Sequence, residues 1–337
     1  MDKTFSINNQ EVLPGQRKTI ELVLARLYDF TELTLPIHII RGKTDGPTLF
    51  LSGAIHGDEL VGPAIIKQII HDRRLRSISG TLVAVPIVNV FGFNNKSRYL
   101  PDRRDLNRCF PGSETGSLAS RIAHLFMKEV VEKCQYGIDY HSGAIHRSNL
   151  PQVRTVAEHP ENRKLAEAFG APVILDSKLR EGSIRQAAAG IGIRVVLFEG
   201  GEALRLDEKV IKLGVNGAFS VMGKIGMLPE SSNLPERQAY FAKSNYWIRA
   251  AQSGMIRFKK GLGSRVKTGS TLGTISDTFG QHSVKITSPT SGIIIGQTKL
   301  PLVNKGDALF HIATFEDSEM VRELEETLSD DVLFSTP

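Results

Sequence analysis

The first two thirds of the chain alternate between short apolar runs and segments with a helical period. The runs at 47–51, 80–86 and 194–198 are almost continuously apolar, which is typical of strands buried on both faces. Between them, residues 60–70 and 117–133 carry apolar side chains every three or four positions, as amphipathic helices do. Alternating strands and helices predict an α/β fold with a largely parallel sheet.

Beyond a polar, proline-containing stretch at 228–237, the pattern changes to short strands separated by glycine-containing turns. Similar turns recur at 266–269 and 303–307, which suggests an internal repeat. This all-β part resembles a biotinyl/lipoyl-type sandwich. Carrier domains of that type present a modifiable lysine on a hairpin tip, but the corresponding tip at 276–282 contains no lysine. We therefore interpret the all-β part as a scaffold or a lid.

Charge is distributed unevenly along the chain. The 337 residues have a formal net charge of +6, although 316–331 contains eight acids and one arginine. The rest of the chain is therefore about +13, a balance that attracts anionic substrates. Together with the change of pattern, this predicts a domain over 1–232 led by short strands, a β-rich domain over 233–315 and an acidic tail over 316–337. The tail is expected to be either a short helix or a solvated segment.

Composition also excludes several classes of protein. Lysine and arginine do not alternate with aromatic residues in a stripe, so we expect no nucleic-acid partner. No apolar run reaches membrane-spanning length, and the first residues lack a basic region followed by an apolar core. We expect no membrane partner and a cytoplasmic location. The two cysteines, Cys109 and Cys134, are too few for a disulfide framework.

Ionisable side chains stand where three of the expected strands end. His56 and Glu59 lie between the first buried strand and the helix after it, while His141 and Glu199 end two later strands. The carboxyl ends of strands in an α/β sheet form the edge where ligands usually bind. Two histidines and one glutamate suit a zinc ion with an open position for water, and a second glutamate can act as the base.

Each of these residues also has a simpler interpretation. His56 and Glu59 could be a surface histidine beside an acid that starts a helix. His141 could be a histidine with satisfied hydrogen bonds at a strand end, and Glu199 could be a buried carboxylate paired with an arginine. The joint placement of all four at strand ends favours a zinc hydrolase over these alternatives.

Two loops are expected beside this site. The segment 94–116 is long for a connection within a compact domain, and such loops are usually functional. It contains four arginines, whose guanidinium groups match carboxylates: Arg98, Arg103, Arg104 and Arg108. Residues 148–154 are expected to form a second loop over the site, and His146 either faces the pocket or lies at the surface or in the core.

Four motifs in this order resemble the succinylglutamate desuccinylase/aspartoacylase family, whose members are relatives of the zinc carboxypeptidases. They are the H-G-D-E motif within 53–59, R-D-L-N-R-C-F-P-G at 104–112, D-Y-H-S-G at 139–143 and the Glu-Gly-Gly run from 199. The resemblance spans roughly residues 12–315. Two departures are Tyr140, where the family usually has leucine, and Glu202, where a small residue is more usual; neither removes a ligand.

The resemblance implies a carboxypeptidase-like mixed sheet flanked by helices and assigns a role to each site residue. One zinc ion per chain would be bound by His56, Glu59 and His141, and Glu199 would accept the proton of the attacking water. The resemblance further implies that a substrate carboxylate is bound by Asn107 and Arg108, and that the oxyanion is stabilised by Arg98, with Arg103 and Arg104 as competitors for that role. Asp139 is expected either to support a ligand histidine or to cap its strand.

The expected activity is therefore hydrolysis of the amide bond in a small anionic N-acyl amino acid or a related amide, giving a carboxylate and an amine. A metallopeptidase acting on short peptides would use the same catalytic groups, so the sequence leaves this alternative open. A non-catalytic binding protein would be expected to lack a ligand or the base, and all four positions are filled. A homo-oligomer is also left open.

Overall fold

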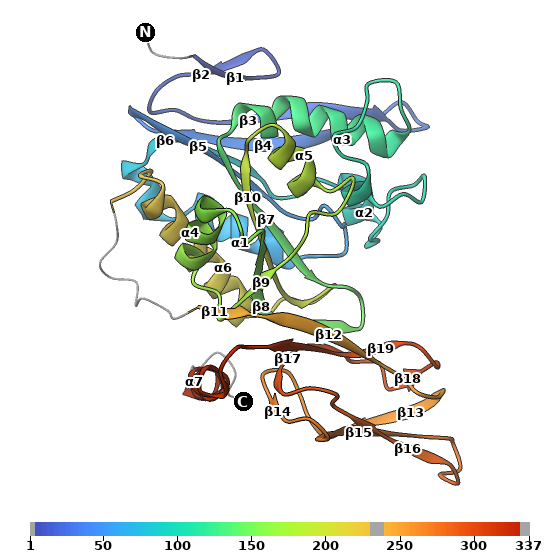
Figure 1. Ribbon diagram of the computed structural model, residues 1–337. Helices are drawn as coiled ribbons and strands as arrows, with labels where there is room; N and C mark the ends of the chain where they lie inside the picture. The colour runs from blue at the N-terminus through green and yellow to red at the C-terminus, as the bar shows by residue number, and fades with distance from the viewer. Residues whose placement is uncertain (1–3, 230–238, 331–337) are drawn as a thin grey trace.

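A mixed sheet of 13 strands runs through the molecule (Figure 1). The computed structural model describes residues 4–229 and 239–330. The main path of the sheet has the order β12-β19-β17-β8-β10-β7-β5-β6-β4-β3, with β9, β11 and β14 attached beside it. Its strands are β3 (Arg17–Arg26), β4 (Glu32–Arg41), β5 (Thr44–Ser52), β6 (Ser79–Val85), β7 (Tyr136–Gly143), β8 (Arg147–Thr155), β9 (Val173–Asp176), β10 (Arg194–Glu202), β11 (Tyr240–Ala242), β12 (Ser244–Arg249), β14 (Arg265–Val266), β17 (Gly292–Thr298) and β19 (Ala308–Thr314).

The centre of this sheet is parallel and its flanks are antiparallel. Strands β6, β5, β7 and β10 pair in parallel, as the alternating pattern predicted. Strands β4 and β3 extend one flank in antiparallel pairing, and β8, β17, β19 and β12 extend the other. The carboxyl ends of the four parallel strands therefore lie at the same edge of the sheet.

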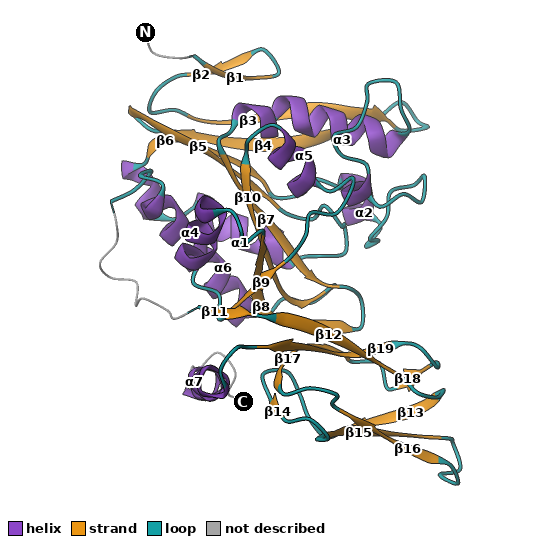
Figure 2. Cartoon of the chain, in the orientation of Figure 1, coloured by secondary structure: helices purple, strands orange, loops and turns teal. Residues whose placement is uncertain are grey.

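Helices cover both faces of the parallel centre (Figure 2). One face packs against α1, α4 and α6, and the other against α3 and α5. No helix of the described residues is both long and apolar enough to cross a membrane. The helices are α1 (Val61–Ile70), α2 (Val90–Asn94), α3 (Leu118–Glu129), α4 (Pro160–Phe169), α5 (Ile184–Gly190), α6 (Glu208–Lys224) and α7 (Ser318–Asp330), with 3₁₀ turns η1 (Arg73–Ser77), η2 (Leu106–Arg108) and η3 (Val131–Lys133).

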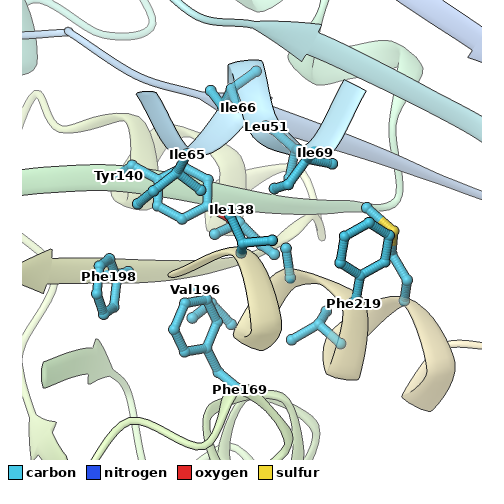
Figure 3. Packing of buried hydrophobic residues seen from close by; sticks show 14 of the residues in the cluster. Leu51, Ile65, Ile66, Ile69, Ile138, Tyr140, Phe169, Val196, Phe198 and Phe219 are labelled. Atoms are coloured by element: carbon cyan, nitrogen blue, oxygen red, sulfur yellow. The ribbon is translucent and has the colours of Figure 1, made fainter. Parts of the chain in front are cut away.

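Strand β5 shows why an uninterrupted apolar run is needed at the centre. Leu49 and Leu51 belong to the core beneath α1, whereas Phe50 belongs to the core on the opposite face. In a strand that is buried on both faces, every side chain is removed from water. A polar residue at any position would therefore be buried without solvation, which is costly. Figure 3 shows the first of these cores, in which Ile65 and Ile69 of α1 lie over Leu51 and the other strand residues.

The C-terminal part builds a second layer on the antiparallel flank. A four-stranded antiparallel sheet packs against β12, β17 and β19 and encloses an apolar core. The predicted β-rich region is thus confirmed in part, as an antiparallel sheet packed on the main sheet, while its likeness to a biotinyl/lipoyl domain and the domain limits stay predictions. Most of the stretch at 228–237 lies outside the described residues. The four strands are β13 (Gly254–Phe258), β15 (Thr271–Ser276), β16 (Ser283–Thr287) and β18 (Leu302–Val303), and a separate hairpin joins β1 (Phe5–Ile7) to β2 (Gln10–Val12).

The acidic segment is a packed helix rather than a solvated one over the residues that the structure describes. Helix α7 buries Val321, Leu324 and Leu328 against a cluster that includes Leu150 of β8 and Ile293 of β17. Its acidic side chains therefore lie on one side of an amphipathic helix. Apolar positions three and four residues apart at 321, 324 and 328 are the sequence signal for this packing.

Gly62→Ala is expected to destabilise the protein by about 1–3 kcal/mol, although alanine favours helices. A methyl group at Gly62 of α1 would lie 2.9 Å from Cβ of Tyr140 and 3.0 Å from Cα of Gly53, so the helix would have to move. Gly190→Ala in α5 is the matched control, because nothing lies within 4 Å of its added methyl group. The free energy of unfolding of that control should rise by about 0.5–1 kcal/mol. If both variants changed the unfolding temperature by the same amount, α1 would not be packed as closely against Tyr140 and Gly53 as described.

Candidate active site

Three buried ionisable side chains meet at the carboxyl edge of the parallel strands. His56 and Glu59 follow β5, and His141 lies near the end of β7. The parallel register pairs Ser52 with Asp139, which brings the ends of these two strands side by side. His56, Glu59 and His141 are 4%, 2% and 5% exposed, so water is largely excluded from all three. Each offers a ligand atom, and these atoms lie within 4.8 Å of one another.

The loop before α1 is shaped so that His56 and Glu59 point inward together. The carbonyl of His56 accepts the amide hydrogen of Glu59, which closes a tight turn. Gly57 lies against α2, where a side-chain carbon would come within 2.0 Å of the backbone of Gly92. A glycine is therefore required at this position of the motif, and the predicted His56/Glu59 placement at the start of the helix is confirmed.

Glu59 lies between the two imidazole rings. Its Oε1 is 2.8 Å from Nδ1 of His56, and its Oε2 is 2.8 Å from Nδ1 of His141. The opposite ring nitrogens face other carboxylates: Nε2 of His141 lies 2.8 Å from Asp139 and Nε2 of His56 lies 3.0 Å from Asp105. A carboxylate at Nε2 keeps the hydrogen there and leaves Nδ1 free to bind a cation. Of its two expected roles, the contact of Asp139 with Nε2 of His141 favours support of that histidine.

The pKa values of these groups show how strongly they are coupled. Burial alone would raise the pKa of Glu59, but the charges of His56 and His141 hold it far below its usual range. Burial would lower the pKa of His141, yet Asp139 and Glu59 raise it well above the usual histidine value. The pKa of His56 is likewise raised against the effect of burial by Glu59 and Asp105. The carboxylates around the two histidines therefore carry negative charge that only positive charge at the site can balance.

The donor set fits a zinc ion. Two imidazole nitrogens and one carboxylate are the ligands of many catalytic zinc sites, and here they already converge. If both histidines are neutral, the carboxylates of Glu59, Asp105 and Asp139 with the guanidinium of Arg98 sum to a charge of −2. A divalent cation balances that charge in a buried place where an unbalanced charge is costly.

Arg98 of the arginine-rich loop reaches this group. Its Nη1 donates to Oε1 of Glu59 and its Nη2 donates to Asp105, each at 3.2 Å. Arg103 and Arg104, which the sequence left as competitors, are exposed, and Arg104 lies 3.8 Å from Asp102 instead. The structure therefore places Arg98, and neither of its competitors, beside the group of His56, Glu59 and His141.

Asn107 and Arg108 lie in the same loop as Arg98 but differ in their exposure to solvent. Asn107 is buried, and its side-chain oxygen accepts the amide hydrogen of Ile184 at 3.0 Å, which fixes the start of α5. Arg108 is exposed and its guanidinium donates to the backbone carbonyl of Asn107. Burial and then the charges of Arg180 and Arg98 lower the pKa of Arg108, against the effect of Asp105. Arg108 thus belongs to a cationic group. The contact with Ile184 uses only the oxygen of Asn107, and a carboxylate would be bound by the hydrogens on its Nδ2, so the predicted role of Asn107 stays open.

Glu199 lies beside the group of His56, Glu59 and His141 but is not a member of it. It is the register partner of His141 on the neighbouring strand β10. Its two carboxylate oxygens accept from Nδ2 of Asn149 at 2.7 Å and from Nε of Arg154 at 2.5 Å, both on β8. The arginine pair named as the simpler interpretation of Glu199 is therefore present. Its side chain is still 18% exposed, so these two contacts do not bury it completely.

Sequence reasoning missed several residues of the site. Residues 148–154 were expected to be a loop, but they lie within β8 and supply Asn149 and Arg154. Arg185 of α5 is buried, its Nη1 has no hydrogen-bond partner within the described chain, and burial lowers its pKa to about 10. Asp105 could have been found, because it stands inside the motif at 104–112. His146 lies at the surface.

The fold and the site together define a mixed α/β protein with a buried His-Glu-His group at the carboxyl edge of its sheet. The model of the succinylglutamate desuccinylase/aspartoacylase catalytic domain matches residues 45–225, which is more than half of the chain. The protein belongs to the succinylglutamate desuccinylase/aspartoacylase family.

The individual proteins that resemble this chain share less than a quarter of their residues with it. An N-alpha-acetyl-L-2,4-diaminobutyric acid deacetylase from Halomonas elongata is 23% identical over 297 residues, covering 84% of this chain and 86% of the relative. The product-bound ectoine utilization protein EutE (DoeB) from Ruegeria pomeroyi has a TM-score of 0.81 at 23% identity, over 93% of this chain and all of that one. A succinylglutamate desuccinylase/aspartoacylase from Rhodobacter sphaeroides has a TM-score of 0.79 at 22% identity, over 89% and 95%. These structural likenesses establish a shared fold.

Asp105→Asn is expected to weaken zinc binding by about 10–100-fold, because an amide supports the Nε2 hydrogen of His56 less strongly than a carboxylate does. Asp102→Asn is the matched control: Asp102 lies in the same loop but accepts the amide hydrogen of Ala119 in α3 and touches neither histidine. Competition with a chromophoric chelator measures both affinities. Equal affinities in the two variants would show that Asp105 does not support His56.

Proposed function

We propose that this protein is a zinc-dependent amide hydrolase that removes the acyl group from a small N-acylated amino acid or a related amide. The observation that carries the proposal is the convergence of His56, Glu59 and His141 with both Nε2 atoms tied to carboxylates. Such an arrangement prepares two nitrogens and one carboxylate for a metal before it arrives. Family membership and the deacetylase from Halomonas elongata support the same reaction class.

A zinc ion bound by these three residues would lower the pKa of a water molecule and polarise the amide carbonyl. Glu199, fixed in orientation by Asn149 and Arg154, would act as the general base that takes a proton from the attacking water and passes it to the leaving amine. Arg98, held at the site by Glu59 and Asp105, donates to the carbonyl oxygen as it becomes negative.

The positive charge around the site favours an anionic substrate. Burial and then the charge of the neighbouring Arg180 lower the pKa of Arg108, against the effect of Asp105, and the buried Nη1 of Arg185 has no hydrogen-bond partner among the described residues. Guanidinium groups bind carboxylates through paired hydrogen bonds. We assign the substrate carboxylate to Arg108, with Asn107 holding the loop and α5 in place through its contact with Ile184.

The experiment that tests this function is amine release from N-acetyl and N-succinyl amino acids, N-acetylated diamino acids and dipeptides, with added zinc and with a chelator. Chelator-sensitive cleavage of an acyl amino acid is the expected result. Cleavage of dipeptides alone would move the protein to the metallopeptidases, which share the catalytic groups. Turnover that a chelator does not affect, or no turnover by a zinc-loaded protein on any member of the panel, would count against the proposal.

Glu199→Gln is expected to keep zinc and to lose about 10²–10⁴-fold in kcat, because the amide cannot accept the proton. Glu202→Gln, three residues further along the same strand, is the control and should retain activity. Thermal unfolding of both variants separates the two interpretations of Glu199. A large loss of stability with unchanged kcat would assign it to the structural pair with Arg154.

Arg108→Ala is expected to raise KM about tenfold or more for substrates with a free carboxylate, since one charge-assisted hydrogen-bonded pair is lost. The corresponding substrate amides should show little change. Arg104→Ala, in the same loop but exposed and directed to Asp102, serves as the control. An equal loss on charged and uncharged substrates would argue against carboxylate binding by Arg108.

A further inference from the structure

A second cavity lies at the opposite edge of the sheet from the candidate active site. It has a volume of about 370 Å³ and is lined by the turn before β3, the end of β4, and the segment from His71 to Ile78 after α1. Strand β5 separates it from the histidines: the cavity lies near the start of β5, and His56 follows the end. Nine residues of extended strand span roughly 25 Å. The cavity is therefore not an extension of the candidate active site.

Its lining is strongly cationic. Five basic residues contribute to it: Arg17, Arg41, Lys43, Arg73 and Arg76. The acid among the lining residues is Asp72, and both of its oxygens accept from Arg74, a residue that points away and stacks on Phe219. Among the residues that the structure describes, Lys43, Arg73 and Arg76 form no ion pair. These three side chains thus bring positive charge to the cavity that no described carboxylate pairs with.

Two of these arginines are fixed in place. Arg41 is 7% exposed and its Nη1 donates to the carbonyl of Val12 at 2.8 Å, so it forms a rigid floor. Arg17 donates to the carbonyl of Ile70 at the end of α1. That helix end carries about half a negative charge, which is much less than the combined charge of Lys43, Arg73 and Arg76. Burial, followed by the charges of Arg17 and His71, lowers the pKa of the neighbouring His38, as expected for a positive local field.

We propose that this cavity is a binding site for a small, multiply charged oxyanion, such as a phosphate ester or a polycarboxylate. Its volume lies within the range of about 300–1,000 Å³ that is usual for small-molecule sites. The fork of the guanidinium group binds phosphate and carboxylate oxygens in pairs. A concave shape with a buried arginine as its floor favours a compact ligand over the extended backbone of a nucleic acid, which is bound along a groove or stripe.

The test is calorimetric titration of the full-length protein with inorganic phosphate and, separately, with succinate, at low ionic strength. The diagnostic variant is Arg73→Ala/Arg76→Ala, whose side chains are exposed in η1. Lys259→Ala/Lys260→Ala on the C-terminal sheet removes the same charge from an exposed surface elsewhere. Arg108→Ala reports binding of the same anion at the candidate active site.

The expected result is saturable binding of at least one of the two anions that weakens about tenfold or more in the Arg73/Arg76 variant. The lysine variant and Arg108→Ala should retain that binding. The anion that binds more tightly identifies the phosphate or the carboxylate class. The proposal is overturned by no saturable binding, by loss of binding in Arg108→Ala alone, or by equal loss in the lysine variant. It is also overturned if duplex DNA binds through Arg73 and Arg76 and neither small anion does.

Discussion

A carboxylate held between two imidazoles, with water excluded, is the interaction on which the rest of the site depends. Glu59 touches Nδ1 of both His56 and His141 at 2.8 Å, and each ring has a second carboxylate at its other nitrogen. Buried charge of this density is stable only when it is balanced and hydrogen-bonded. A divalent cation at the shared position would provide that balance, so the group of His56, Glu59 and His141 could hold a metal ion.

The sheet supplies the precision that such a site needs. The parallel pairing of β5 with β7 sets the spacing of the two histidine-bearing strand ends, and β10 places Glu199 beside His141. Strand β8 pairs with the other edge of β10 in antiparallel direction, and its side chains bind both oxygens of Glu199. The C-terminal strands continue from β8 through β17, so the all-β part is joined to the strand that orients the candidate base.

The parallel centre of the sheet and the convergence of His56, Glu59 and His141 at its edge could be predicted from the sequence, whereas the contacts of β8 and α7 could not. The β5-loop-α1 unit, with His56 and Glu59 in its turn, follows from a continuous apolar run and a helical period a few residues apart. Strand β8 was misread as a loop because Asn149, Pro151 and Gln152 interrupt its apolar pattern. Its polar side chains are accommodated by contacts with residues about 50 positions away, such as Asn149 with Glu199. Helix α7 was left undecided because its few apolar positions have meaning only against β8 and β17.

The central claim is that His56, Glu59 and His141 form a metal site whose histidines bind through Nδ1. Crystals grown with zinc and measured on both sides of the zinc absorption edge test it most directly. The account predicts one anomalous peak per chain, within bonding distance of Nδ1 of both histidines and of Glu59, with Nε2 still bonded to Asp105 and Asp139. Zinc-supplemented crystals with no peak there, or with the ion bound through Nε2, would contradict it.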